Sequence, residues 1–429
     1  DGQPNRVDMS DKTTDSLAQQ LANARVGLKP RNTVFTDERG NVHMERITGD
    51  PLVDERKTEE KKASQERMKA PWIHMHGRLG AKNWAAPIIT KVCNEDARPG
   101  YNTCKAHEYN EDPETFSEKI KKLAEIIQKS KRCIAYTGAG ISTASGIADY
   151  ASRDSGRPKL MSPFDAQPTL AHRVLAALHK EGFLKNWIQQ NHDGLPQKAG
   201  YPQKDLNEIH GSWYDPSNPV VMMSGNLRED LFSWLIEWEK KSDLCLTLGT
   251  SLCGMNSDRM ALTCSKQNPE LGTVIISLQQ TQLDEHASLR FFSTCDKVMG
   301  ALAKEMNLKL PEEKVYIPNI PKDTIVEQDV FLVGYDAKTG KKNGDERFKL
   351  DLRVDSKVVI PVGQYKGVQG TVQGKNREGH YKICFYHRLK KGSKIKRPQV
   401  RVLGRWWIEA ATNGTIDQLP LIPLTISAD

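Results

Sequence analysis

Apolar and polar residues alternate along the middle of the chain in two different patterns. Short continuous apolar runs are typical of buried strands, and apolar residues that recur every three or four positions are typical of amphipathic helices. Helical patterns begin after Asp112-Pro113, an N-cap followed by a first-turn proline, and recur at 170–179 and 229–241. The apolar runs are residues 133–137, 186–189, 219–223, 244–248 and 273–278. This alternation predicts an α/β fold with a doubly wound, Rossmann-like parallel sheet over residues 113–310.

The C-terminal part of the chain has a different pattern. Residues 311–325 form a proline-punctuated linker, and residues 326–429 contain short alternating apolar runs separated by turn sequences such as Lys341-Lys-Asn-Gly344. Short strands at this spacing predict a small all-β domain, either a barrel or a sandwich. The expected strands are 330–334, 348–354, 357–361, 370–372, 380–386 and 400–403.

The N-terminal 112 residues show little sustained periodicity. Polar and charged residues dominate, and one short helix is expected over residues 52–69. A segment of this length without its own core is expected to be an extended arm, disordered or laid on another surface. His74, His76, Cys93 and Cys104 are conceivable metal ligands, but their spacing fits no common zinc site. Scattered structural side chains are therefore the favoured interpretation, and no metal site is predicted.

Composition and charge limit the class of protein. The chain has 429 residues, 38% of them hydrophobic and 27% charged, with a formal net charge of +8. No apolar run is long enough for a membrane span, so no membrane contact is expected. Eight scattered cysteines, several in expected strands, favour a reducing compartment. We therefore expect an intracellular, cytoplasmic protein; a cytoskeletal or ciliary assembly, the nucleus and the mitochondrion remain alternatives.

The stretch from Cys133 to Tyr150 contains the first candidate binding motif. An apolar strand is followed by Gly138 and Gly140 and then by a short run that can open a helix. Glycines allow a sharp turn and the close approach of a phosphate, and free N–H groups at a helix start can hold an anion. A tight strand-to-helix turn without a ligand is the alternative, because a Gly-x-Gly turn alone is weak evidence for dinucleotide binding.

Further segments, taken together, resemble the sirtuin family. Their order along residues 130–300 matches the family's order, which makes chance agreement improbable. The matching segments are Gly138-Ala-Gly-Ile-Ser142, Gly146-Ile-Ala-Asp149-Tyr150, Pro168-Thr-Leu-Ala-His172, Gln190-Asn-His-Asp-Gly-Leu195, Glu208-Ile-His-Gly211, Leu248-Gly-Thr-Ser-Leu252 and Cys295-Asp-Lys-Val-Met299. The resemblance does not extend to either flank.

The resemblance implies NAD as cofactor and a site built from several loops. Ala139 and its neighbours would hold the diphosphate, Asp149 and Tyr150 would border the nicotinamide, and Cys295 would lie at the adenine. The implied cofactor-binding residues are Gly138, Ala139, Gly140, Ser142, Asp149, Tyr150, Gln190, Gly249, Thr250, Ser251, Ser277 and Cys295. Ser277 stands where the family usually has asparagine.

The resemblance also implies protein lysine deacylation, with acyl transfer to ADP-ribose and release of nicotinamide. Asn191 and Asp193 would orient the ribose and carboxamide, and His210 would be the general base for the ribose hydroxyls. An imidazole with an ordinary pKa near 6.5 suits proton transfer at neutral pH. A structural histidine is the alternative for His210.

Several departures from the family pattern place that activity in doubt. The usual arginine after the aspartate is Ala151, and the preceding proline is Ala148. No Cys-x-x-Cys pair occurs in the chain, so the zinc-binding segment that usually follows the histidine is expected to be absent. The substrate-binding segment is altered at 223–225 as well. The dinucleotide site could persist while lysine deacylation is impaired.

The C-terminal domain adds a candidate interaction surface. Residues 363–372 resemble a KOW or SH3-like barrel turn, although the match is short. Basic residues gather from Arg388 to Arg405 beside Tyr386, Trp406 and Trp407. Such a cluster can bind nucleic acid through phosphates and stacking, can dock an acidic protein surface, or can be a solvated loop.

Three functions therefore remain open from sequence. The first is a sirtuin-like, NAD-binding deacylase, possible but impaired. The second is a structural or interaction subunit of a large assembly, held to protein partners by the N-terminal arm and the basic C-terminal domain. The third is an NAD glycohydrolase or ADP-ribosyl transferase.

Overall fold

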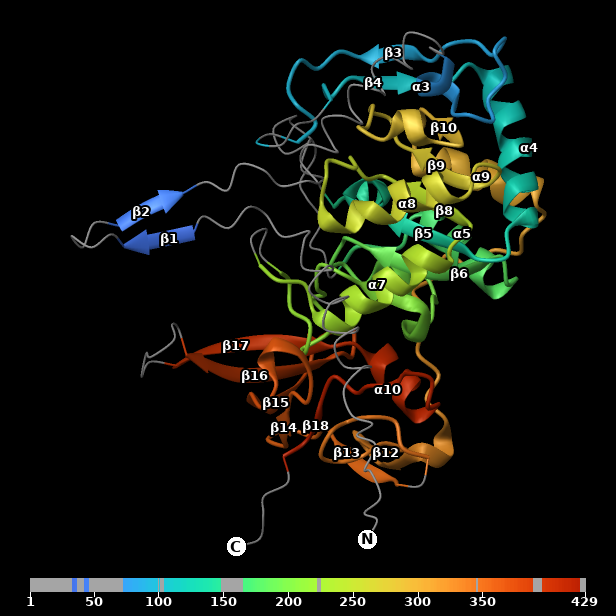
Figure 1. Cartoon of the computed structure of the whole chain (residues 1–429). Coiled ribbons are helices and arrows are strands. Elements are labelled where there is room, and N and C mark those ends of the chain that lie inside the picture. Colours follow the sequence, from blue (N-terminus) through green and yellow to red (C-terminus); the bar gives the residue numbers. More distant parts are fainter. Residues whose placement is uncertain are drawn as a thin grey trace, which may run out of the picture. The chain divides into compact units, whose positions relative to one another are not determined.

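The computed structural model describes residues 72–98, 100, 104–147, 165–221, 225–344, 346–388 and 396–424, together with the backbone of two short strands near the N-terminus. The chain divides into two units, residues 1–70 and residues 71–429. In the first unit, β1 (Thr33–Thr36) and β2 (Val42–Glu45) form an antiparallel pair. The helix expected at 52–69 lies outside the described residues. The second unit contains everything discussed below (Figure 1).

A six-stranded parallel sheet is the centre of the second unit, and it confirms the predicted fold class. Its strand order is β10-β9-β8-β5-β6-β7. The strands are β5 (Cys133–Thr137), β6 (Leu184–Gln189), β7 (Leu206–Glu208), β8 (Leu244–Leu248), β9 (Gly272–Ile276) and β10 (Leu289–Phe291). The chain runs outward from β5 to β7 on one side and from β8 to β10 on the other. The order therefore reverses between β5 and β8, which is where ligands bind in open α/β sheets.

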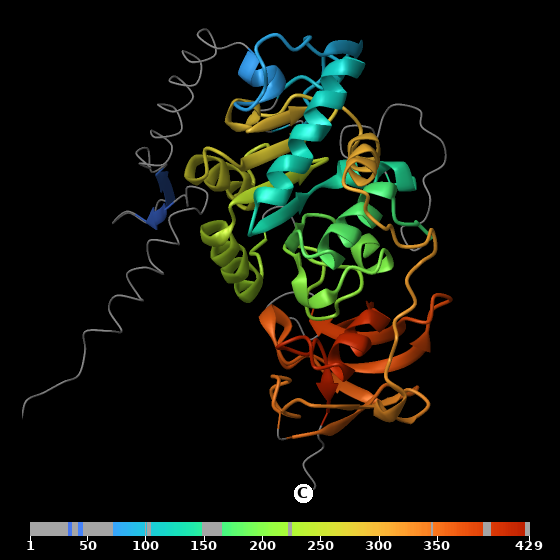
Figure 2. The same ribbon diagram turned by 90° about the vertical axis from the view of Figure 1, so that its right-hand side faces the viewer.

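Helices cover both faces of this sheet because successive strand residues point to opposite sides. Cys133 and Ala135 of β5 pack with α4, α5 and α9, whereas Ile134 and Tyr136 pack with α7 and α8. Figure 2 shows α4 crossing one side of the sheet. The helices are α4 (Pro113–Lys129), α5 (Leu170–Lys180), α6 (Leu195–Lys198), α7 (Glu229–Lys241), α8 (Arg259–Gln267) and α9 (Cys295–Glu305). The side chain of Asp112 accepts hydrogen bonds from the N–H groups of Glu114 and Thr115, as the predicted N-cap requires.

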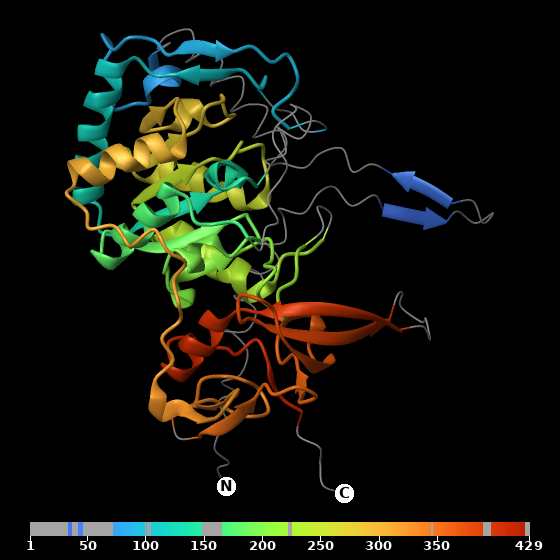
Figure 3. The ribbon, with the colours of Figure 1, turned by 180° about the vertical axis from the view of Figure 1, so that it is seen from behind.

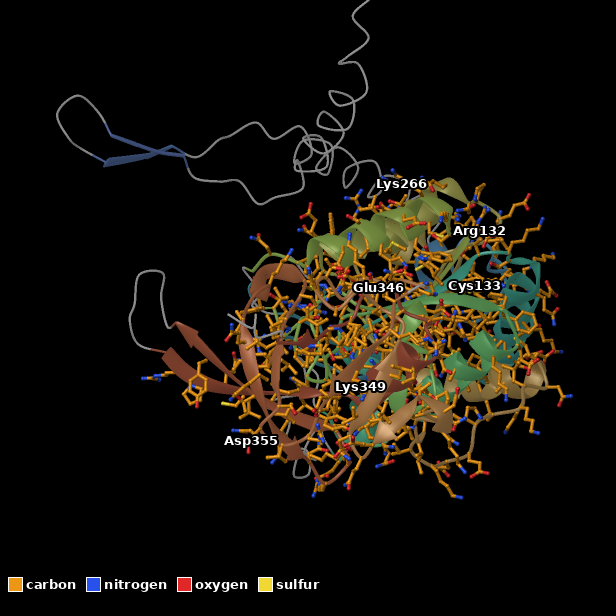
Figure 4. All side chains as sticks on the ribbon, turned by 90° about the horizontal axis from the view of Figure 1, so that it is seen from below. Arg132, Cys133, Lys266, Glu346, Lys349 and Asp355 are labelled. Atoms are coloured by element: carbon orange, nitrogen blue, oxygen red, sulfur yellow. The ribbon has the colours of Figure 1, made fainter. Side chains whose placement is uncertain are left out.

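The amino ends of the two central strands are tied by one carboxylate. Asp243, just before β8, accepts hydrogen bonds from the backbone N–H groups of Lys131 and Arg132, each at 3.0 Å. Figure 4 labels Arg132 and Cys133 at this end of β5. The opposite, carboxyl ends of β5 and β8 carry the two glycine turns of the candidate site.

The segment before α4 packs on the sheet domain. It contains α3 (Trp72–His76) and the antiparallel pair of β3 (Ile88–Lys91) and β4 (Glu108–Asn110). The backbone of Leu79 donates to Ser288, and that of Tyr109 donates to Leu278. A fully buried ion pair joins Lys119 of α4 to Glu111 at 2.7 Å. The predicted arm, residues 1–112, is therefore laid on the chain's own sheet from residue 72 onward, and the division into units falls at 70/71.

In the described part of the C-terminal region the strands pair antiparallel, and an α-helix accompanies them (Figure 3). Its two sheets have the orders β11-β12-β13 and β17-β16-β15-β14-β18. The elements are β11 (Ile325–Glu327), β12 (Val330–Val333), β13 (Phe348–Asp351), β14 (Lys357–Val359), β15 (Gln369–Lys375), β16 (Tyr381–Arg388), β17 (Lys396–Leu403), α10 (Arg405–Thr412) and β18 (Ile422–Pro423). Figure 4 labels Lys349 of β13 and Asp355 in this region.

One local expectation differs from the structure, and several short elements were not predicted. The apolar run at 219–223 does not join the sheet over its described residues, 219–221; Val221 instead donates to the carbonyl of His210 at 2.9 Å. The strands β7 and β10, each only three residues long, and the helix α10 were not predicted. Such short strands carry too little periodicity to be recognised.

Candidate functional site

Two glycine turns meet at the point where the strand order reverses. The turn after β5 contains Gly138 and Gly140, and the turn after β8 contains Gly249. The backbone N–H of Gly140 donates to the carbonyl of Gly249 at 2.8 Å. A Cβ atom at Gly140 would lie 2.7 Å from the Cα of Gly249, and one at Gly249 would lie 2.4 Å from the nitrogen of Ile141. Only glycine allows this contact between the turns.

The segment after Gly138 forms two 3-10 turns, η2 (Ala139–Ile141) and η3 (Thr143–Ser145), and not the start of a long helix. Gly140 donates to Gly249, while the N–H groups of Ile141 and Ser142 donate to carbonyls inside the turn. These three N–H groups were expected to be free for an anion. They are bonded here because the second glycine turn and the 3-10 geometry both use them.

Asn191, Ser142 and Asp193 form a continuous hydrogen-bonded set across the same point. The amide of Asn191 donates to the carbonyl of Gly138 at 3.0 Å and to the hydroxyl of Ser142 at 3.1 Å. The Ser142 hydroxyl donates to Oδ2 of Asp193 at 2.7 Å. The loop after β6 is thereby fixed to the glycine turn after β5. Asn191 and Asp193, expected to orient the cofactor, both contact Ser142.

Asp193 is buried and serves as a structural centre for its loop. Its second oxygen accepts from the backbone N–H of Leu195 at 3.1 Å. Burial raises the pKa of Asp193, whereas the hydrogen bonds from Ser142 and Leu195 lower it; the net direction is upward. Its two oxygens hold Ser142 and the backbone of Leu195 in place through these hydrogen bonds.

The remaining predicted cofactor residues lie along the carboxyl edge of the sheet. The amide of Gln190 donates to the hydroxyl of Thr250 at 3.0 Å, which joins the loops after β6 and β8. Ser251 follows Thr250, and Ser277 follows β9, beside the bond from Gly249 N–H to the carbonyl of Ile276. Cys295 begins α9 and is buried in the core that also contains Ile141; burial raises its pKa to about 12. Asp149 and Tyr150 lie outside the described residues.

His210 follows the edge strand β7 and is held by two loops. Its Nε2 lies 3.3 Å from the hydroxyl of Ser257, and its ring also bonds the backbone of Gln190. Burial lowers the pKa of His210 to about 4, and the positive charges of His192 and Arg98 act in the same direction. The imidazole is therefore neutral at pH 7, the form that accepts a proton.

The residues from Gly211 to Pro219 form a closed loop beside His210. The backbone N–H of Ser212 donates to the carbonyl of Asn218 at 2.8 Å, and the amide of Asn218 donates to the carbonyl of Glu208 at 2.9 Å. The two ends of the loop are thus held together. No group of three or more His, Cys, Asp or Glu side chains that could hold a metal was found in the described part of the chain.

Four residues near His210 were missed by sequence reasoning. Tyr136, Ser257 and Asp258 are buried behind the histidine and bonded to one another. Arg98 reaches this region from the segment before α4, where its guanidinium lies 3.4 Å from the sulfur of Met255. Tyr136 lies inside an apolar strand run, and Arg98 lies in a stretch without periodicity, so neither had a local pattern to mark it.

Comparisons with known proteins agree with this geometry. The model of the Sir2 family matches residues 157–217. The NAD-dependent protein deacetylase SRT1 of Arabidopsis thaliana is 32% identical over 285 residues, which cover 56% of this chain and 57% of the plant protein. An NAD-dependent protein deacetylase of Saccharolobus solfataricus is 31% identical over 224 residues, which cover 39% of this chain and 89% of the archaeal protein.

A solved Sir2 enzyme structure covers 44% of this chain and 98% of its own, with 24% identity and a TM-score of 0.40. The fold of the sheet domain is defined by its strand order, β10-β9-β8-β5-β6-β7. The chain spans just over half the length of the plant relative. Nearly the whole length of the archaeal deacetylase aligns with it at 31% identity. The chain belongs to the Sir2 family.

Proposed function

We propose that this chain binds NAD at the glycine turns after β5 and β8. The observation that carries the proposal is the hydrogen-bonded set of Asn191, Ser142 and Asp193, which is fixed to two glycine turns whose close contact a Cβ atom would obstruct. The two relatives described above are named NAD-dependent deacetylases. Gln190 and Thr250 would bind the ribose side, and Ser277 and Cys295 would border the adenine.

We further propose that lysine deacylation is possible but impaired. NAD, when bound, supplies an anomeric carbon from which nicotinamide can leave. His210, neutral at pH 7, would take a proton from a ribose hydroxyl, and Asn191 would orient the cofactor beside it. The changes at Ala148, Ala151 and 223–225, with no Cys-x-x-Cys pair in the chain, support weaker binding of an acylated peptide.

A second candidate is a structural subunit of a larger assembly. The short loop after His210 inserts Tyr214 into the core of the C-terminal region, in the place along the chain where the family's zinc-binding segment would stand. That packing favours a rigid support over a peptide-binding groove. An intracellular, cytoplasmic setting with protein partners remains our proposal for both functions.

The test is a nicotinamide-release assay with and without an acetylated peptide, together with calorimetry of NAD binding. We expect NAD to bind, and peptide to stimulate release only weakly. His210→Ala should lower peptide-dependent release about 10²- to 10⁴-fold without abolishing NAD binding. The matched control is His179→Ala. His179 lies in α5, and its Nε2 is 2.8 Å from Oδ2 of Asp205.

Three results separate the candidates. Release that does not depend on peptide would favour the NAD glycohydrolase. No NAD binding at millimolar cofactor would reject the cofactor proposal and leave the structural subunit. Peptide-dependent release at the same rate as an active deacetylase would reject the proposed impairment.

A further inference from the structure

A buried chain of hydroxyl groups connects His210 to a carboxylate behind it. Nε2 of His210 lies 3.3 Å from Oγ of Ser257. The hydroxyl of Tyr136 lies 2.6 Å from the same Oγ and 2.8 Å from Oδ1 of Asp258. Tyr136 and Ser257 are fully buried, and Asp258 is 5% exposed. Each contact is within hydrogen-bonding distance, so a continuous series of hydrogen bonds runs from the imidazole to the carboxylate.

At the far end of this hydrogen-bonded series, backbone groups hold Asp258 in place. Its other oxygen, Oδ2, accepts the backbone N–H groups of Gly254 at 2.9 Å and Met255 at 2.8 Å. Only Oδ1 therefore faces Tyr136. Burial raises the pKa of Asp258, and the hydrogen bonds from Tyr136 and the two backbone groups lower it; the net direction is upward. A buried carboxyl of this kind can take up a proton at a milder pH than an exposed one.

The hydrogen bonds can be arranged in two ways, since each hydroxyl has one proton to donate. If Asp258 is ionised, Tyr136 donates to it, Ser257 donates to Tyr136, and Nε2–H of His210 donates to Ser257. If Asp258 is protonated, all three bonds reverse, and Ser257 donates to a bare Nε2. The imidazolium with an ionised Asp258 and the neutral imidazole with a protonated Asp258 contain the same number of protons.

We propose that Ser257, Tyr136 and Asp258 form a proton wire that takes the proton from the His210 imidazolium and stores it on Asp258. The Nε2–H bond breaks as an Oγ–H bond forms on Ser257, whose own proton passes to the Tyr136 oxygen. The proton of Tyr136 passes in turn to Oδ1 of Asp258. The positive charge on the ring and the negative charge on the carboxylate disappear together, and no outside reagent is needed.

The basic groups around His210 favour loss of the proton from its ring, whereas at the other end of the wire Arg98 opposes its uptake. His192 and Arg98 both act against a positive charge on His210. Arg98 also acts on Asp258, where it favours the ionised form. Moving the proton away from the ring removes a buried cation from beside two basic groups. Ser257, Tyr136 and Asp258 are thus positioning and proton-storing residues, one step removed from the ribose.

The wire deepens the proposed function at the same site, so its test must not depend on turnover. The experiment is a pH titration of the His210 ring by NMR, with ¹⁵N-labelled histidine in the full chain. In the parent chain we expect two inflections, because two coupled groups share their protons. Tyr136→Phe removes one hydroxyl from the wire. It should leave a single inflection, about one pH unit lower, because the hydrogen bonds that couple the protonation of the ring to that of the carboxylate are broken.

Two further variants keep the test decisive. Ser257→Ala interrupts the wire at its other hydroxyl and should also give one inflection, which covers the case in which Tyr136→Phe fails to fold. Tyr201→Phe is the matched control, because it removes a buried tyrosine hydroxyl without a hydrogen-bond partner among the described residues and should keep both inflections. A single inflection in the parent chain, or two in Ser257→Ala, would overturn the wire.

NAD calorimetry on the same samples separates the two proposals. Absent NAD binding with two inflections would reject the proposed cofactor and retain the wire. NAD binding with a single inflection would support the proposed cofactor and reject the wire.

Discussion

Glu208, two residues before His210, carries a carboxyl group that is buried at the end of β7. Its Oε1 has no hydrogen-bond partner among the described residues. Burial raises its pKa to about 8; the nearby Asp215 and Asp193 act in the same direction, and hydrogen bonds from Ser212 and Gln197 oppose it. The folded protein therefore holds this proton more tightly than the unfolded chain does, where the pKa is near 4.5.

Glu208→Gln should remove a pH dependence of stability. Because the pKa is higher in the folded state, the contribution of Glu208 is fully present below about pH 4.5 and is lost as pH rises toward 8. The loss has a limiting slope of about 1.4 kcal/mol per pH unit. The free energy of unfolding of the variant minus that of the parent chain should therefore increase from pH 5 to pH 8.

Denaturant unfolding at several pH values measures this difference. The control is Glu125→Gln on the exposed surface of α4, which should keep the slope of the parent chain. A difference between Glu208→Gln and the parent that stays constant from pH 5 to pH 8 would contradict the assignment.

At the scale of elements, the ends of β5 and β8 depend on the contact between two glycine turns. Gly249 has a φ of +60° and approaches the backbone of Ile141. Gly254, five residues later, has a φ of +89° but open space where a Cβ would stand. The two positions share the left-handed backbone and differ in the close approach, so they form a matched pair.

Gly249→Ala should therefore destabilise the protein more than Gly254→Ala. Both substitutions incur the cost of a left-handed alanine, about 1–2 kcal/mol. Gly249→Ala adds a clash with backbone, which costs about 1–3 kcal/mol more and separates the two turns. Denaturant unfolding should show the difference, and NAD calorimetry should show weaker binding for Gly249→Ala alone. Equal losses for the two variants would mean that the close approach is unimportant.

At the scale of the whole second unit, the sheet domain and the C-terminal region share a buried interface. Tyr214, from the loop after His210, packs against Trp406 and His380 with ring centroids 4.9 and 5.0 Å away. Its carbonyl accepts from the N–H of Gly404 at 3.0 Å. Arg401 donates to the carbonyl of Pro216 at 2.7 Å. The C-terminal region is therefore an integral part of the fold beside the candidate site.

This interface changes the interpretation of the basic and aromatic cluster. Trp406 and Trp407 are 4% and 8% exposed and belong to the C-terminal core, so they are not available to stack on bases. The guanidinium of Arg401 lies 4.1 Å from the ring centre of Tyr365 and is largely buried. Tyr386 is 55% exposed and remains the accessible aromatic side chain of the proposed surface. Helix α10 is the reason, because it turns both tryptophans inward.

An ion pair across the interface provides the third stability prediction. The ammonium of Lys198, whose side chain is fully buried, lies 2.8 Å from Glu378. Glu378→Gln leaves that charge without its carboxylate and should cost about 3–5 kcal/mol. The double variant Lys198→Met/Glu378→Leu should recover most of the loss, because it leaves no buried charge.

Thermal and denaturant unfolding would measure both variants. The comparison is Lys204→Met, which breaks an exposed pair with Asp205 and should cost less than about 1 kcal/mol. If Glu378→Gln is as mild as Lys204→Met, the pair does not hold the interface together.

No helix in the described part of the chain is both long and apolar enough to cross a membrane. The eight cysteines, all within that part, are free thiols.

The sequence by itself determined the parallel sheet, its main helices and the glycine turns. Buried strands such as 133–137 are apolar throughout, helix α4 carries its own cap, and close-packed turns require glycine, so each has a local physical cause. Asn191, Asp193 and His210 could be placed near those turns because parallel strands end on one edge.

Only the tertiary structure decided the surroundings of His210. Tyr136, the adjacent pair Ser257 and Asp258, and Arg98 come from three separate segments, and their meeting depends on which strands and loops become neighbours. Tyr214 and Trp406 became core residues for the same reason. Local periodicity reports whether a residue is buried in its own element, but contacts between distant segments are set by packing of the whole unit.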